Sequence, residues 1–140
     1  MIAVVDTSVA LKWYVQESDS AIARPLLELE LAAPDFILVE LANALWKKLR
    51  KGEIARPQAD SAISHLAESV KLVPSALLVD EALNLGLELL HPVYDCLYLV
   101  LASELRVPLV TADERFSRRL RGSRWATGVV PLKEWDERND

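Results

Sequence analysis

Short apolar runs alternate with longer segments of helical spacing along this chain of 140 residues, and the alternation constrains the fold more than any other feature. The first run, residues 2–5, is too short for a helix and is typical of a buried strand. The segments between the runs repeat apolar side chains every three or four residues, as amphipathic helices do. Strands that alternate with helices are typical of βαβ units, so we predict an α/β sandwich with a mostly parallel central sheet. The predicted strands are residues 2–5, 31–34, 71–73, 107–110 and 128–131, and the predicted helices are residues 8–14, 21–31, 36–50, 57–70, 80–90, 92–106 and 114–120.

The length of the chain and the lack of a dividing linker or repeat indicate a single domain, residues 1–140. The longest apolar stretches, such as residues 97–102, are far shorter than the roughly 20 residues that a membrane span requires. With no targeting segment visible at the start, we predict a cytoplasmic protein with no membrane partner. The short tail after Trp135 is predicted to be frayed.

Cys96 is the only cysteine, so an internal disulfide is excluded and a zinc site cannot be built from cysteine alone. It lies within an apolar helical stretch. The sequence therefore predicts a buried, inert thiol.

Four acidic residues stand where a predicted strand ends or a predicted helix begins: Asp6, Glu40, Asp95 and Asp113. Ligands of open α/β sheets bind at the carboxyl ends of the strands, so acids at those positions indicate a shared site. Clustered carboxylates repel one another unless a cation holds them together. The pattern therefore predicts a centre for a hard divalent metal ion.

Polar side chains accompany these acids. Glu40 and Asn43 are three residues apart and share one helix face. Thr7 and Ser8 follow the first acid, and Thr111 precedes the last one by two residues. An oxygen-rich pocket of this kind suits Mg²⁺ or Mn²⁺, and such ions promote the hydrolysis of phosphodiesters.

The formal net charge of −5 argues weakly against a nucleic-acid partner, but it becomes −1 when the four acids are counted as a metal site. Local fields decide whether a phosphate backbone is attracted, and the basic residues are clustered. Basic residues in a last helical turn can also serve only as a solvated face that compensates the helix dipole, and that alternative stays open. One basic group comprises Lys47, Lys48, Arg50 and Lys51, and the other comprises Arg115, Arg118, Arg119, Arg121 and Arg124.

Four motifs, in this order and spacing, resemble those of PIN-domain ribonucleases, and most closely the VapC-type toxins of bacterial and archaeal toxin–antitoxin pairs. The similarity extends from the first residues to about Pro131. Each motif alone is weak, whereas four in order are specific. The motifs are VVDTSVA at residues 4–10, APD at 33–35 with VELANAL at 39–45, VYDCLY at 93–98 and VTAD at 110–113.

The resemblance implies a PIN-like three-layer α/β/α sandwich and hydrolysis of RNA by an activated water, with Mg²⁺ or Mn²⁺ as cofactor. It also implies a homodimer, and a cognate antitoxin that forms a hetero-oligomer with the toxin. By position, the catalytic and metal-binding acids are Asp6, Glu40, Asp95 and Asp113, the supporting polar residues are Ser8, Asn43 and Thr111, and the candidate RNA contacts are Lys47, Arg115, Arg118 and Arg119.

Several side chains also have a structural interpretation. Asp6, Asp95 and Asp113 could each cap a helix or favour its positive end. His65 and His91 are predicted to be structural or exposed, without a partner at ligand spacing. Three aromatic residues are predicted to lie in the core or a dimer interface rather than to stack on bases: Trp13, Tyr14 and Trp46.

Other functions remain as alternatives to a toxin. The chain could be a PIN nuclease of RNA processing, or a PIN-like interaction module without catalysis, although all four acids are present. A receiver-type signalling domain would need paired acids after its first strand, and these are absent. A Gly-rich phosphate loop is also absent, which argues against a nucleotide-binding domain.

Overall fold

The computed structural model describes residues 1–138 and contains one five-stranded sheet in the order β3-β2-β1-β4-β5. Every pair of neighbouring strands is parallel. The first strand therefore lies at the centre of the sheet, and the residue that follows it emerges in the middle of the sheet's carboxyl edge. The strands are β1 (Ala3–Val5), β2 (Leu31–Pro34), β3 (Lys71–Val73), β4 (Leu109–Thr111) and β5 (Val129–Pro131).

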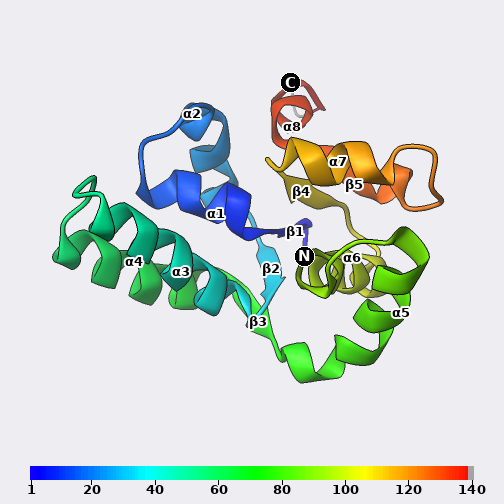
Figure 1. Ribbon diagram of the computed structural model, residues 1–140. Helices are drawn as coiled ribbons and strands as arrows, with labels where there is room; N and C mark the ends of the chain where they lie inside the picture. The colour runs from blue at the N-terminus through cyan, green and yellow to red at the C-terminus, as the bar shows by residue number, and fades with distance from the viewer. Residues whose placement is uncertain (139–140) are drawn as a thin grey trace.

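Helices cover both faces of this sheet, with α1, α3 and α4 on one side and α5 and α6 on the other (Figure 1). The predicted three-layer α/β/α sandwich is confirmed. The helices are α1 (Thr7–Tyr14), α2 (Ser20–Ala23), α3 (Ile37–Arg50), α4 (Arg56–Ser69), α5 (Val79–Leu89), α6 (Val93–Leu105), α7 (Glu114–Leu120) and α8 (Leu132–Arg138), and the 3-10 turns are η1 (Arg24–Glu28), η2 (Ser75–Leu77) and η3 (Ala126–Gly128).

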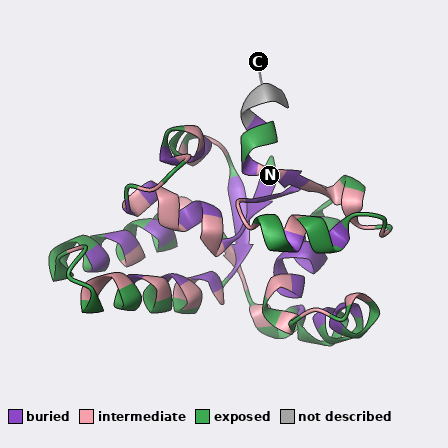
Figure 2. Ribbon diagram, turned by 45° about the horizontal axis from the view of Figure 1, so that its top comes forward, coloured by how far each residue is buried: buried purple, intermediate pink, exposed green. Residues whose placement is uncertain are grey.

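The core lies between the sheet and its helices, and Figure 2 shows buried strands in the middle of the molecule while the outer helix faces are exposed; the fully buried strands are β1, β2 and β4. Helix α6 is buried along an unbroken stretch from Cys96 to Ala102, which explains its continuous apolar sequence. The Cys96 side chain is free and fully buried, as predicted, and burial raises the pKa of its thiol to about 11. Within residues 1–138 no single helix has both the length and the apolar composition to cross a membrane; α5 and α6 pass that test only as a pair bent by 113°.

Two predicted segments differ from the structure. The predicted helix at residues 21–31 is replaced by the short α2 and by η1, because Pro25 has no N–H group to continue a helix and Leu31 belongs to β2. The tail after Trp135 was predicted to be frayed, but α8 continues through Arg138; the last two residues lie outside the described part of the chain.

The turn between α5 and α6 is unusually close. Leu90 adopts a left-handed conformation with φ of 53°, and the backbone N–H of His91 donates to the carbonyl of Gly86 at 3.1 Å. A Cβ atom at position 86 would lie only 2.9 Å from the His91 carbonyl oxygen, so this approach requires glycine. The turn thereby places His91 directly before α6.

Candidate active site

Asp6 occupies the centre of the site, because it directly follows the central strand, and it is only 6% exposed. Its Oδ1 caps α1 by accepting the backbone N–H groups of Ser8 at 3.1 Å and Val9 at 3.4 Å. The Ser8 hydroxyl donates to the same oxygen, and the Thr111 hydroxyl donates to Oδ2. Asp6 therefore caps α1, as one interpretation of the sequence predicted, and its carboxylate also lies in a pocket of polar side chains.

The direction of these two hydroxyls is fixed by the backbone. The N–H of Ala112 donates to Ser8 Oγ at 2.8 Å, and the N–H of Asp113 donates to Thr111 Oγ1 at 3.0 Å. Each hydroxyl has a single hydrogen, so an oxygen that accepts a backbone bond is free to direct that hydrogen toward Asp6. The end of β4 thus holds the carboxylate that follows β1, because Thr111 donates to it directly and the N–H of Ala112 orients the Ser8 hydroxyl toward it.

Glu40 is held beside this pocket by α1 and α6. Its Oε1 accepts hydrogen bonds from the Thr7 hydroxyl, at 3.2 Å, and from the Tyr98 hydroxyl. The two hydroxyl oxygens are 3.1 Å apart, and Tyr98 is almost completely buried. Both bonds fall on one oxygen, which leaves Oε2 without a donor among the side chains that the structure describes, those of residues 1–135.

The electrostatics show that three acids share one environment. Burial raises the pKa of Asp6 to about 7, although the hydroxyls of Ser8 and Thr111 oppose the rise, and the charge of Asp95 adds to it. Burial also raises the pKa of Glu40, and Asp95 again contributes in the same direction. The structure therefore brings Asp6, Glu40 and Asp95 together from three separate segments.

Asp95 has a partner that the sequence analysis did not expect. His91 Nε2 lies 2.6 Å from Asp95 Oδ2, and the imidazole also packs against Phe116 with ring centroids 4.8 Å apart. The prediction that His91 has no partner at ligand spacing is therefore wrong. His65 is exposed, as predicted, and its Nδ1 lies 2.8 Å from the Tyr14 hydroxyl.

The Asp113 side chain caps the helix that follows it, α7. Its Oδ1 accepts the backbone N–H of Phe116 at 3.0 Å and caps α7. It joins the pocket through its backbone, because its N–H orients the Thr111 hydroxyl. The side chain is half-buried, beside the end of β4.

The donor chemistry fits a hard divalent cation, since the groups that converge are carboxylate and hydroxyl oxygens. Within residues 1–138, no three Asp, Glu, His or Cys side chains are arranged to hold a metal ion as they stand. Asp95 faces His91 and Asp113 faces the start of α7.

A groove of about 740 Å³ opens from Glu40 along α3. The predicted residues Asn43 and Lys47 both line it. Thr7 of α1 borders the groove, and so do two aromatic residues, Phe36 and Tyr94. The face shared by Glu40, Asn43 and Lys47 is thus the face that borders open space.

A smaller hollow of about 480 Å³ lies beside α7 and is lined by Leu90, His91, Arg115, Arg118 and Arg119. The three predicted arginines therefore lie together, next to the histidine that contacts Asp95. Arg119 is also structural, because its guanidinium donates to the carbonyls of Leu89 at 3.0 Å and Leu90 at 2.8 Å. Arg124 lies apart from the hollow, paired with Glu88 at 2.8 Å.

Residues 3–120 match the family model described as PIN domain. The chain belongs to the PIN domain family. A relative in Pyrobaculum aerophilum named Ribonuclease VapC3 is 31% identical over 121 residues, which are 83% of this chain and 92% of the relative. The resemblance to VapC-type PIN proteins seen in the sequence is thereby confirmed.

Solved structures show the same PIN fold. The crystal structure of PAE2754 from Pyrobaculum aerophilum superposes with a TM-score of 0.74 at 23% identity, covering 99% of this chain and 96% of that one. A toxin–antitoxin complex from Klebsiella pneumoniae gives a TM-score of 0.64 at 17% identity, with 93% and 97% covered. VapBC-1 from nontypeable Haemophilus influenzae gives 0.61 at 18% identity, with 95% and 99% covered.

Two polar residues of this PIN domain were missed although the sequence carries a signal for them. His91 and Tyr98 stand four residues before and three residues after Asp95, which places all three on one side of the turn and helix. Among the aromatic residues, Trp13 is buried and its indole donates to the Ala23 carbonyl at 2.8 Å, as a core residue should. Trp46 is 50% exposed, so it is not a core residue, and the alternative that it lies in a dimer interface stays a prediction.

Proposed function

We propose that this PIN domain is a divalent-metal-dependent endoribonuclease that hydrolyses RNA phosphodiester bonds with an activated water, and that it is the toxin of a type II toxin–antitoxin pair in the cytoplasm. The observation that carries the proposal is the polar pocket beside the end of β1, in which the hydroxyls of Ser8 and Thr111 hold Asp6 while those of Thr7 and Tyr98 hold Glu40. The charge of Asp95 raises the pKa of both acids, which agrees with a place beside them. The name of the relative, Ribonuclease VapC3, supports the same activity.

The residues that would hold Mg²⁺ or Mn²⁺ are Asp6, Glu40, Asp95 and Asp113. A divalent ion in such a site supplies positive charge that activates water and offsets the charge of the scissile phosphate. His91 contacts Oδ2 of Asp95, and the cap of α7 uses Oδ1 of Asp113, so each of these carboxylates has a second oxygen for the ion.

The protein's own groups prepare this site. Ser8 and Thr111 direct two hydroxyl hydrogens at Asp6, which favours its ionised form against the effect of burial. Thr7 and Tyr98 hold one oxygen of Glu40. Burial and Glu40 both raise the pKa of Tyr98, so its hydroxyl stays protonated and remains a donor.

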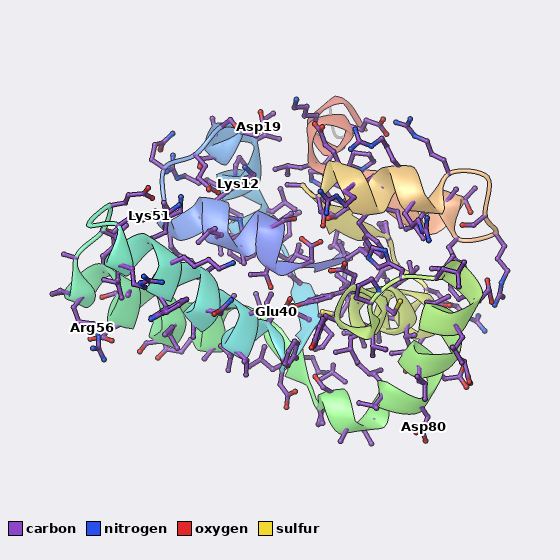
Figure 3. All side chains as sticks on the ribbon, in the orientation of Figure 1. Lys12, Asp19, Glu40, Lys51, Arg56 and Asp80 are labelled. Atoms are coloured by element: carbon purple, nitrogen blue, oxygen red, sulfur yellow. The ribbon has the colours of Figure 1, made fainter. Side chains whose placement is uncertain are left out.

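Cleavage of RNA by purified protein tests the activity. Wild type should cleave a single-stranded RNA in Mg²⁺ or Mn²⁺ and not in EDTA, while Asp6→Asn and Asp95→Asn should lose at least 100-fold in rate. Asp80→Asn is the matched control, because Asp80 is an exposed carboxylate of α5 far from Glu40 (Figure 3). Equal cleavage in EDTA, or by the two site variants, would disprove the proposal.

The partner part of the proposal has its own test. Two solved structures of the same fold are described as a toxin–antitoxin complex and as VapBC-1, which supports a protein antitoxin for this chain. Expression of wild type should arrest growth, Asp6→Asn should not, and the product of a short reading frame immediately upstream should relieve the arrest by binding the protein. Sedimentation of the purified chain tests the proposed homodimer, and a monomer at all concentrations would exclude it.

A further inference from the structure

The groove beside α3 has an aromatic surface that the proposed chemistry does not use. Phe36, just before α3, and Tyr94, in the first turn of α6, stack with ring centroids 5.6 Å apart and an interplanar angle of 10°. Both residues line the groove that also contains Glu40. Tyr94 is 59% exposed, so one face of its ring rests on Phe36 while the ring remains accessible from the groove.

Two lysines continue the groove away from the acid pocket. Glu40, Asn43, Lys47 and Lys51 follow one another at intervals of three or four residues, and all line the groove. Figure 3 shows Glu40 beside the sheet at one end of α3 and Lys51 at the other end. At 1.5 Å per residue, this row is about 16 Å long.

The charges of these two lysines are uncompensated. Lys48 forms ion pairs with Glu17 at 3.6 Å and Glu53 at 3.1 Å. Lys47 and Lys51, in contrast, form no ion pair with an acidic side chain of residues 1–135, the part of the chain whose side chains the structure describes. An anionic ligand in the groove would meet both of them.

We propose that this groove binds an unpaired segment of RNA, with a base stacked on Tyr94 and the backbone phosphates on Lys47 and Lys51. Proteins bind single-stranded nucleic acids with exposed aromatic rings, on which bases stack, and with cations that contact the phosphates. A base in a duplex has no free face for the ring, so the groove selects unpaired RNA. Because Glu40 is at the inner end of the row, the bound strand leads into the acid pocket. The inference rests on the proposed ribonuclease function and names its substrate class.

Stacking is tested by RNA binding in an Asp6→Asn background, where cleavage does not disturb the measurement. Tyr94→Leu should weaken the binding of a short single-stranded RNA roughly tenfold, because one base–ring contact is lost. Tyr94→Phe should retain wild-type affinity, since it keeps the ring. Trp46→Leu is the control for loss of an exposed aromatic residue outside the groove. Binding of the same RNA annealed to its complement should change less than twofold in all these variants.

The lysine contacts are tested by the salt dependence of the same binding. Each of Lys47→Gln and Lys51→Gln should reduce the slope of log affinity against log salt by about 0.7, the value for one phosphate contact on a single strand. Lys71→Gln, which removes an exposed lysine at the start of β3, should leave the slope unchanged.

An unchanged affinity of Tyr94→Leu for single-stranded RNA, or an equal loss for single-stranded and duplex RNA, would overturn the inference. It would also be overturned if Tyr94→Leu left RNA binding intact but weakened binding of a protein partner, because the groove would then hold a protein segment. Failure of the proposed function is distinguishable, since wild type would then not cleave RNA whatever the binding results in the inactive background.

Discussion

The groove beside α3 holds Lys47 and Lys51 next to an aromatic pair, whereas the hollow beside α7 gathers Arg115, Arg118 and Arg119 around one histidine. Both basic groups follow an acid of the site by a few residues in the sequence. Only the groove adds accessible rings to its positive charge, and only the hollow has an arginine that binds backbone carbonyls.

The two basic regions therefore differ in the ligand groups that they suit, although both contain clustered positive charge. The α3 side combines surfaces for bases and for phosphates, so it suits a whole nucleotide strand. The α7 side offers positive charge alone, which suits phosphate oxygens, and part of that charge stabilises the junction of α5 and α6. The acids follow the same division: Glu40 has one oxygen without a donor, while Asp113 caps α7.

The largest effect should separate these two acids in catalysis. Glu40→Gln should reduce kcat/KM for RNA cleavage on the order of 1000-fold, as expected when a preorganised charge at the reacting centre is removed. Asp113→Asn should cost only about tenfold, because asparagine also caps helices and keeps an oxygen for the site. Steady-state cleavage of one single-stranded RNA in Mg²⁺ measures both. Equal losses would show that the two sides contribute alike.

A smaller effect should appear in stability, with opposite signs for the buried acid and the capping acid. The pKa of Asp6 is about 7 in the folded protein against an ordinary value of 3.8, so the folded state binds this proton more tightly than the unfolded chain does. The contribution of Asp6 to the free energy of unfolding of the metal-free protein should therefore be largest below pH 4 and be lost as the pH rises through 7. Asp6→Asn should remove this loss and stabilise the protein by roughly 2–4 kcal/mol at pH 8.

Denaturant unfolding in EDTA between pH 4 and pH 8 measures the effect. The comparison variant is Asp113→Ala, which removes the cap of α7 and should destabilise by about 1 kcal/mol. A wild-type stability that does not change between pH 4 and pH 8 would contradict the account of Asp6. So would a loss of stability in Asp6→Asn at pH 8.

The smallest effect should distinguish the arginines within the hollow. Arg119→Gln should lower the free energy of unfolding by about 1 kcal/mol, because it removes the donors to the Leu89 and Leu90 carbonyls. Arg118→Gln, its matched neighbour, should stay within about 0.5 kcal/mol of wild type. Thermal unfolding of the two variants side by side is sufficient, and identical melting temperatures would remove the structural role of Arg119.

The sheet, and the place of Asp6 at its carboxyl edge, could be predicted because they depend on local patterns. Asp6 is found from the apolar run before it, and parallel strands must place their carboxyl ends at one edge. The contact between His91 and Asp95 could be predicted only in part. The spacing of four residues indicates it, but the contact also depends on how the turn after α5 aims the imidazole. The hydrogen bonds from Arg119 to the end of α5 depend in the same way on where α7 packs, which no local sequence pattern predicts. The helix predicted across residues 21–31 failed for the opposite reason, because Pro25 was interpreted as part of the first turns of a helix, whereas it lies in a 3-10 turn that ends at Glu28.

The candidate site also depends on Gly86, although this residue contributes no side chain to it. Replacing a glycine inside a helix by alanine is a common route to a more heat-resistant protein, because the unfolded chain loses freedom. At this position the new methyl group would meet the His91 carbonyl at 2.9 Å, and the turn that carries the imidazole would have to move. We therefore expect Gly86→Ala to lower the rate of the proposed RNA cleavage, even though such a substitution is made to raise thermal stability. The size of this loss would measure how strongly the site depends on the position of Asp95.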